Sequence, residues 1–232
     1  MNAGRCACLW MVTLITAVGP ESAQRVTAAQ GSEVPALPPS IPIFPLQDVV
    51  LFPNASRPLH IFEPRYRAMV ADALEGDRII GMVLLQPGHG AEYEGRPPIY
   101  TVGSAGLIEE FEELSDGRYN IVLQGLVKFR VVTEDQTRAY RVAEVEALPE
   151  VLNDPDRATL HRRRVQLEEL LAVAAPDLEL PATLPAERLV DGLSLILDLD
   201  PGARQELLEL DGPLRRAESL IERIQRQLAR PL

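Results

Sequence analysis

The chain has 232 residues, of which 46% are hydrophobic and 25% are charged, a composition typical of an ordinary globular protein rather than a disordered or fibrous one. Its formal net charge of −11 makes the surface acidic, and an acidic surface repels nucleic-acid phosphates and anionic lipid headgroups. The composition therefore argues against nucleic acid as a partner and against binding to a membrane surface.

Residues 1–29 are predicted to be a signal peptide. Arg5 precedes an apolar run at 7–18, which is shorter than the roughly 20 residues that a membrane-spanning helix needs. Residues 27–29 (Thr-Ala-Ala) offer a cleavage site of small residues. We therefore expect a secreted or periplasmic protein with no stable membrane insertion after leader removal. If the start codon is mis-assigned, the protein is instead cytoplasmic.

A proline-rich linker is predicted at 30–40, after the leader. Both cysteines of the chain, Cys6 and Cys8, precede this linker and lie in the leader. The mature chain would therefore form no disulfide and no thiolate metal site.

The most informative stretch is 118–132 (RYNIVLQGLVKFRVV), in which apolar and polar residues alternate as in a strand with one buried face. This strand is much longer than the usual 5–6 residues or so. Gly125 lies at its middle on the inward face, where a missing side chain permits a bend. We therefore expect a strand that serves two sheets or closes a small barrel, as the core of a β-rich lobe at 41–150.

Other elements are predicted around this strand. Prolines in the apolar run at 41–53 favour an edge strand or two short strands, and a helix is expected from Pro64 to a stop at Gly76. Glycine at position 117 favours a hairpin turn at 115–117. The other strands of an expected six-stranded sheet are at 59–62, 79–85, 100–114 and 140–148.

After Pro149 the hydrophobic period changes from two to about three and a half, which predicts helices. Their apolar faces span 160–174, 189–197 and 214–228, and 198–202 is predicted to be a turn. The fold class is therefore α+β, a curled six-stranded β pseudo-barrel followed by a C-terminal α-helical bundle. Residues 41–150 and 151–232 are expected to be two lobes of one domain.

Three segments resemble a known family: 41–74 (with LHIFEPRYR), 78–85 (RIIGMVLL) and 102–132 (with GRYNIVLQGLVKFR). They are similar to the N-terminal substrate-binding domain of Lon proteases, in the form found as free-standing single-domain proteins. The resemblance covers about 41–230. It implies a pseudo-barrel with a helical bundle that binds unfolded or misfolded polypeptide, helps to assemble a protease and has no chemistry or cofactor of its own.

The residues that ATPase or protease chemistry needs are not found in the sequence. No GxxxxGK motif followed by Ser or Thr occurs, so a phosphate-binding loop is not expected. Lys128 is the only lysine and the only candidate base for a serine–lysine protease. Because it lies on the polar face of the alternating strand, we expect a solvated side chain. We therefore predict no enzymatic activity.

The histidines, His60, His89 and His161, are far apart in sequence, so no metal site is predicted. His60 precedes Glu63 by three residues, and a hydrolase with an improvised site at these two residues is an alternative hypothesis. The other explanation is a strand-end histidine beside a glutamate at a helix start, where a negative charge is favourable.

The sequence also offers a candidate binding site for polypeptide. Phe52, Phe62 and Tyr66 are predicted to form an apolar cluster, with Glu63 and Arg65 at its rim. We expect this cluster to border a groove in which an extended peptide adds to an edge strand. Alternatively, the rings at 62 and 66 are core residues that join helix to sheet. A third hypothesis is a scaffold or assembly protein whose helical half pairs with a partner, such as a protease, or with itself.

Overall fold

The computed structural model describes residues 36–88, 95–135, 137–181 and 183–229, which all fall in one compact unit. The predicted signal peptide at 1–29 lies outside the described residues. The strands are β1 (Ser40–Leu46), β2 (Ser56–Ile61), β3 (Ile79–Leu84), β4 (Val102–Glu113), β5 (Tyr119–Asp135) and β6 (Arg141–Leu148). The helices are α1 (Pro64–Glu75), α2 (Asp154–Ala174), α3 (Ala186–Ile196), α4 (Pro201–Glu209) and α5 (Gly212–Leu228). This order confirms the α+β class.

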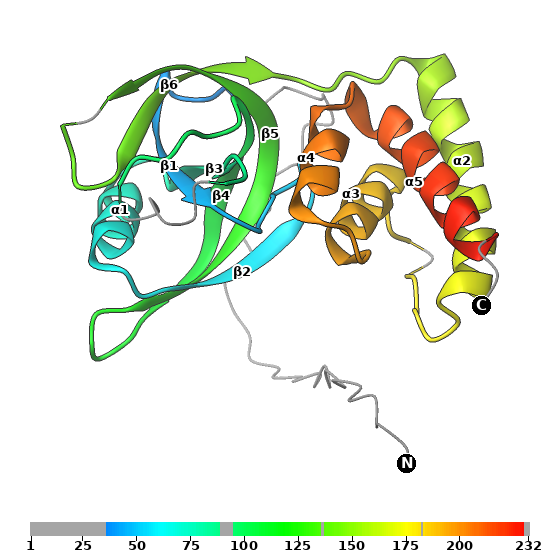
Figure 1. Ribbon diagram of the computed structural model, residues 1–232, viewed down its shortest axis with the longest axis horizontal. Coiled ribbons are helices and arrows are strands. Elements are labelled where there is room, and N and C mark those ends of the chain that lie inside the picture. Colours follow the sequence, from blue (N-terminus) through cyan, green and yellow to red (C-terminus); the bar gives the residue numbers. More distant parts are fainter. Residues whose placement is uncertain (1–35, 89–94, 136, 182, 230–232) are drawn as a thin grey trace, which may run out of the picture. The chain divides into compact units, whose positions relative to one another are not determined.

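The six strands form one sheet in the order β2-β5-β4-β3-β1-β6, and a further pairing between β5 and β6 closes it into a ring (Figure 1). Closure depends on β5, which has 17 residues. Its first part, from Tyr119 to Gln124, pairs with β2, and its second part, from Lys128 onward, pairs with β6. The prediction of one long strand that bends and serves different partners is confirmed.

Gly125 lies where β5 changes its partner. Its N–H donates to the carbonyl oxygen of Ala55 at 2.8 Å, and its own carbonyl accepts from the N–H of Asn54 at 3.1 Å. A Cβ atom at this position would overlap the carbonyl oxygen of Phe52. Glycine is therefore required because the β1–β2 loop crosses directly over the strand.

The edge strand of the sheet is β2 and not β1, so the prediction of an edge at 41–53 is wrong. β1 pairs in parallel with β3 and antiparallel with β6. Its prolines are tolerated because the two pairings are staggered: Pro42 faces β6 alone and Pro45 faces β3 alone. β2 is paired with β5 and with no other strand in the described part of the chain.

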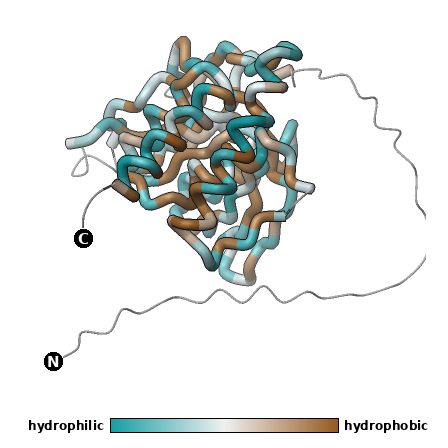
Figure 2. Tube along the Cα trace, turned by 90° about the vertical axis from the view of Figure 1, so that its right-hand side faces the viewer, coloured by the Kyte–Doolittle hydropathy of each residue, from teal (hydrophilic) through white to brown (hydrophobic). Residues whose placement is uncertain are grey.

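The helices pack on two different groups of strand residues. α1 contributes Tyr66, Met69 and Val70 to a core with residues of the strands, and it ends at Gly76 as predicted. The helices α2 to α5 share a second core that also includes Phe52 of the β1–β2 loop. Seen from the helical side, hydrophilic and hydrophobic stretches alternate along the chain, as amphipathic helices require (Figure 2). Within the described residues, no helix is both long and apolar enough to cross a bilayer.

Two local predictions have different outcomes. The hairpin turn between β4 and β5 is confirmed, with Gly117 at a φ of 77°. The segment 198–202 is not a simple turn, because α4 begins at Pro201. The Asp200 carboxylate caps this helix by accepting a hydrogen bond from the N–H of Ala203 at 2.9 Å. Aspartate followed by proline is a helix-start signal that the sequence prediction did not use.

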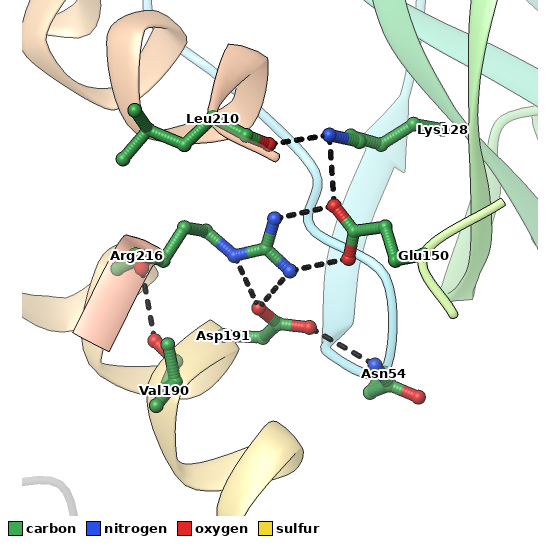
Figure 3. A network of polar contacts seen from close by, with 8 residues as sticks. Asn54, Lys128, Glu150, Val190, Asp191, Leu210 and Arg216 are labelled. Carbon is green, nitrogen blue, oxygen red and sulfur yellow. Dashed lines mark hydrogen bonds and ion pairs between the residues drawn. The ribbon is translucent and has the colours of Figure 1, made fainter. Parts of the chain in front are cut away.

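A buried network of charges joins the ring to the helices (Figure 3). Arg216 of α5 pairs with Asp191 of α3 at 2.8 Å and with Glu150, which follows β6, at 2.6 Å. Lys128 of β5 pairs with Glu150 at 2.8 Å and donates to the Leu210 carbonyl at 2.6 Å. The prediction of a solvated Lys128 is wrong, because its side chain is only 7% exposed. After the bend, Lys128 reaches Glu150 and the Leu210 carbonyl, whereas Arg130, the next polar residue of β5, stays exposed.

The two carboxyl groups of this network respond differently to their surroundings. Burial raises the pKa of Asp191 to about 6, although Arg216 and the amide of Asn54 oppose the shift. Burial also acts to raise the pKa of Glu150, but hydrogen bonds and charges from Arg216, then Lys128, outweigh it and lower the pKa below 4.5. Asp191 thus gains a proton more readily in the folded chain than in the unfolded one.

This difference predicts a pH dependence of stability. Between the pKa of the unfolded aspartate, 3.8, and about 6, the folded chain holds the Asp191 proton and the unfolded chain does not. The contribution of Asp191 to the free energy of unfolding therefore falls as pH rises, by about 1 kcal/mol from pH 5 to pH 7.

Urea titrations of wild type and Asp191→Asn at several pH values measure this effect. The decrease in the free energy of unfolding with pH should appear in the wild type only. Parallel curves would contradict the prediction. Glu150, whose pKa is lowered from 4.5, acts in the opposite direction, mainly below pH 5 and so outside the measured range of pH 5 to pH 7.

Candidate functional site

The five residues predicted to border a groove do not form one surface. Phe52 is fully buried, with the guanidinium of Arg216 over its ring at 5.8 Å. Tyr66 is also buried, and its ring centroid lies 4.4 Å from that of Phe44. Neither ring can therefore line an open groove. Each is buried in a hydrophobic core that also contains segments distant in the sequence. The sequence prediction had no means to detect those segments.

The other three predicted residues lie nearer the surface. Glu63 and Arg65 form an ion pair at 3.0 Å at the start of α1. The side chain of Phe62, between β2 and α1, is 60% exposed. The expectation that Phe62 is a core residue is thus wrong. Of the three aromatic residues predicted to border the groove, Phe62 is the one that faces solvent.

Phe62 lies beside a three-stranded stretch of the sheet. Here β5 has β2 on one side and the end of β4 on the other, and the registers align Pro58 with Val122 and Glu110. In the next row His60 is aligned with Asn120 and Glu112. We call this surface the β2 face, and define it by Pro58, His60, Phe62, Glu110, Glu112, Asn120 and Val122.

A shallow groove of about 480 Å³ lies over the β2 face. Its lining includes Pro58 and Val122, which are apolar, and Glu110 and Glu112, which are acidic and exposed. The opposite side of the same strands is occupied by buried residues such as Ile121. Strand alternation thus divides these segments into a core side and an open side.

Hydrogen bonds connect the polar side chains of the β2 face. The His60 Nδ1–H donates to Asn120 Oδ1 at 2.8 Å, and the Asn120 amide donates to Glu112 at 2.9 Å. Arg118 Nη1 donates to His60 Nε2 at 3.3 Å. Both imidazole nitrogens are therefore engaged, whereas the Glu63 carboxylate pairs with Arg65. His60 and Glu63, the acid–base pair of the hydrolase hypothesis, thus each bind other residues.

Phe62 extends the β2 face at one end. Its ring lies next to the His60 imidazole, with centroids 6.2 Å apart and planes 25° from parallel. The face therefore presents a polar ladder with apolar side chains at Pro58, Val122 and Phe62. Such a surface can hold a peptide through apolar contacts and hydrogen bonds. In the part of the chain that the structure describes, no group of three His, Cys, Asp or Glu could hold a metal ion.

Most residues of the β2 face were missed by the sequence prediction. Two signals could have found them. Asn120 occupies a polar position of the alternating strand at 118–132, and such positions face away from the core. Pro58 stands directly before the apolar run at 59–62, and proline in or beside a strand indicates an edge.

The chain has relatives of known family. Residues 40–226 match the family model of the ATP-dependent protease La (LON) substrate-binding domain. Lon protease 2 of Myxococcus xanthus is 28% identical over 192 residues, which cover 81% of this chain and 22% of the relative. Lon protease 2 of Syntrophobacter fumaroxidans is 32% identical over 180 residues, 75% of this chain and 23% of the relative. The chain thus spans less than a quarter of the length of these two relatives.

Solved structures show the same fold. The Lon N-terminal domain protein from Xanthomonas campestris is 28% identical, with a TM-score of 0.55 over 79% of this chain and 97% of its own. The N-terminal domain of Mycobacterium avium complex Lon protease is 19% identical and is similar in fold, with a TM-score of 0.61 over 80% of this chain and 98% of its own. The chain belongs to the family of Lon substrate-binding domains.

Proposed function

We propose that this chain is a non-catalytic module that binds unfolded or misfolded polypeptide on the β2 face. The observation that carries the proposal is the exposed ring of Phe62 beside β2, whose outer edge is unpaired among the described residues, in a chain of the Lon substrate-binding family. An aromatic side chain exposed beside an open groove is a typical anchor for a binding partner.

The chemistry of the β2 face favours apolar and basic segments of polypeptide. Pro58, Val122 and Phe62 offer apolar contacts, while Glu110 and Glu112 carry negative charge at the groove. The whole chain has a net charge of −11, which adds a general attraction for basic segments. Unfolded chains expose the apolar residues that folded chains bury, so they present the matching chemistry.

We propose the absence of catalysis because the two candidate reactive side chains, Lys128 and His60, are engaged in other contacts. The ammonium of Lys128 is buried in an ion pair with Glu150 and holds a backbone carbonyl, so it supports the fold. Both His60 nitrogens are hydrogen-bonded to Asn120 and Arg118. Neither group is presented to the groove as a base with a nucleophile beside it.

The test is the substitution Phe62→Ala. We expect the dissociation constant for a permanently unfolded, fluorescently labelled reporter protein to rise about tenfold, because the aromatic anchor is lost. The thermal midpoint should change by no more than about 2 °C, since the side chain is 60% exposed.

Val173→Ala is the matched control for this test. Val173 is 69% exposed on α2, away from the β2 face, so its loss should leave the affinity unchanged. Equal affinities for wild type and a folded Phe62→Ala variant, measured by fluorescence anisotropy, would reject the β2 face as the binding site.

A further inference from the structure

Within the part of the chain that the structure describes, two strands of the three-stranded stretch have unpaired backbone edges. β2 pairs with β5 alone, and the end of β4, from Glu109 to Glu113, has no strand on its other side among the described residues. An unpaired edge carries rows of N–H and C=O groups that can accept another strand.

The two edges differ in how they are protected. The end of β4 carries the exposed acids Glu109, Glu110, Glu112 and Glu113. Charged side chains on an edge oppose strand addition. β2 (SRPLHI) contains no acidic residue, and it is followed by the exposed Phe62. Negative charge therefore opposes strand addition at the end of β4 but not at β2, where Arg57 and the missing N–H of Pro58 are the protecting features.

The direction of the β2 backbone groups follows from the pairing. The Ala55 carbonyl accepts from the Gly125 N–H, so it points toward β5. Backbone groups alternate in direction along a strand, so those of Arg57, Leu59 and Ile61 also point toward β5. The N–H groups of Ser56 and His60 point away from β5, as do the carbonyls of Ser56, Pro58 and His60.

Pro58 is consistent with this assignment. Its nitrogen lies on the free side of β2, where the missing N–H costs no hydrogen bond within the sheet. The side chains of Ser56, Pro58 and His60 are all exposed, so they leave the edge open to an approaching chain.

We propose that an extended segment of an unfolded polypeptide pairs with the free edge of β2 and joins the sheet as a further strand. This inference rests on the proposed polypeptide-binding function and states how the polypeptide is held. The segment takes donors and acceptors from the edge at Ser56, Pro58 and His60. Its side chains lie beside Pro58 and Phe62 on one face and beside the half-buried Leu59 on the other.

The chemistry of the occupant follows from these neighbours. β2 has six residues and spans about 20 Å, so a segment of roughly six residues covers the edge. Apolar or β-branched side chains at alternate positions suit Leu59 on one face and Phe62 on the other. Acidic side chains would meet the negative charge of the protein and are disfavoured.

One test removes a single backbone donor. His60→Pro deletes the N–H that points to the free edge, whereas His60→Ala keeps it, and both variants lose the imidazole contacts. We expect the dissociation constant of His60→Pro for the unfolded reporter to be at least about tenfold higher than that of His60→Ala. Equal affinities of the two folded variants would overturn strand addition.

A second test uses the wild-type protein and does not depend on the folding of a variant. The probe is a fluorescein-labelled octapeptide, Lys-Val-Thr-Val-Thr-Val-Thr-Lys, compared with the same peptide methylated at every Val and Thr backbone nitrogen. Methylation removes the donors of both edges and adds apolar surface. We expect binding to be lost. Affinities within about threefold of each other would overturn the inference, because side-chain contacts would then carry binding.

The outcomes separate the two proposals. A wild-type protein that binds no unfolded reporter contradicts the proposed function itself. A protein that binds the reporter equally well in His60→Pro and His60→Ala contradicts the edge inference alone. A wild-type dimer in light scattering that dissociates on His60→Pro, without peptide binding, would overturn polypeptide as the occupant and assign the edge to a second copy of the chain.

Discussion

Replacing Arg216 with alanine is expected to lower the free energy of unfolding by about 3–5 kcal/mol. The Arg216 side chain is fully buried and pairs with both Glu150 and Asp191. Its removal leaves Asp191, itself 0% exposed, as a buried carboxylate without its cation. The cost comes from this uncompensated charge more than from the lost bonds. Urea or thermal unfolding measures the change.

The neighbouring residue provides the control. Arg215 is 66% exposed and pairs with Glu218 at 2.9 Å on the same helix, so Arg215→Ala should cost less than about 0.5 kcal/mol. The double variant Arg216→Met with Asp191→Leu removes both charges and should recover much of the loss, because apolar replacements of a buried pair are often close to neutral. A loss in Arg216→Ala no larger than that in Arg215→Ala would contradict the prediction.

Gly125→Ala is expected to destabilise the fold by at least about 3 kcal/mol, or to prevent soluble expression. The added Cβ would overlap the Phe52 carbonyl oxygen, which belongs to backbone that cannot rotate away. Relief requires the β1–β2 loop to leave β5, which breaks the hydrogen bonds of Gly125 to Asn54 and Ala55. Chemical unfolding and amide exchange of β2 and β5 measure the effect.

Gly192→Ala is the matched control. Gly192 lies within α3, and a Cβ there meets no atom within 4 Å. Since glycine in a helix interior costs about 1 kcal/mol relative to alanine, this change should be neutral or stabilising. A soluble Gly125→Ala protein with wild-type stability would show that the loop crossing is not what demands glycine at this position.

The candidate binding surface was predicted only in part, and the residues show why. Phe52 and Phe62 look alike in sequence, since each lies in an apolar run near a proline. In the fold, one is covered by Arg216 and the helical core while the other is exposed. Exposure depends on what packs against a side chain from a distant part of the chain. Local pattern carries no information about that partner.

The same limit applies to charge. Lys128 follows the alternation of a solvent-facing residue, and Arg216 is one of many arginines in the helical half. Lys128 is buried where Glu150 and the Leu210 carbonyl bind its ammonium, and Arg216 is buried where Glu150 and Asp191 pair with its guanidinium. Arg216 and Glu150 are 66 positions apart in the sequence. A contact over that distance produces no hydrophobic periodicity from which it could be predicted.

What the amino-acid order determined by itself was local. Backbone sterics and hydrophobic periodicity operate over short distances along the chain. They account for the alternation at 118–132, the bend at Gly125, the change of period after Pro149 and the family motifs. Which strand forms the edge, which aromatic ring faces solvent and which charges are buried depended on packing between distant segments. Pairing between β5 and β6 closes the ring and places β1 inside the sheet. Among the described strands, β2 then has a partner on one side only, and the proposed function depends on its other side.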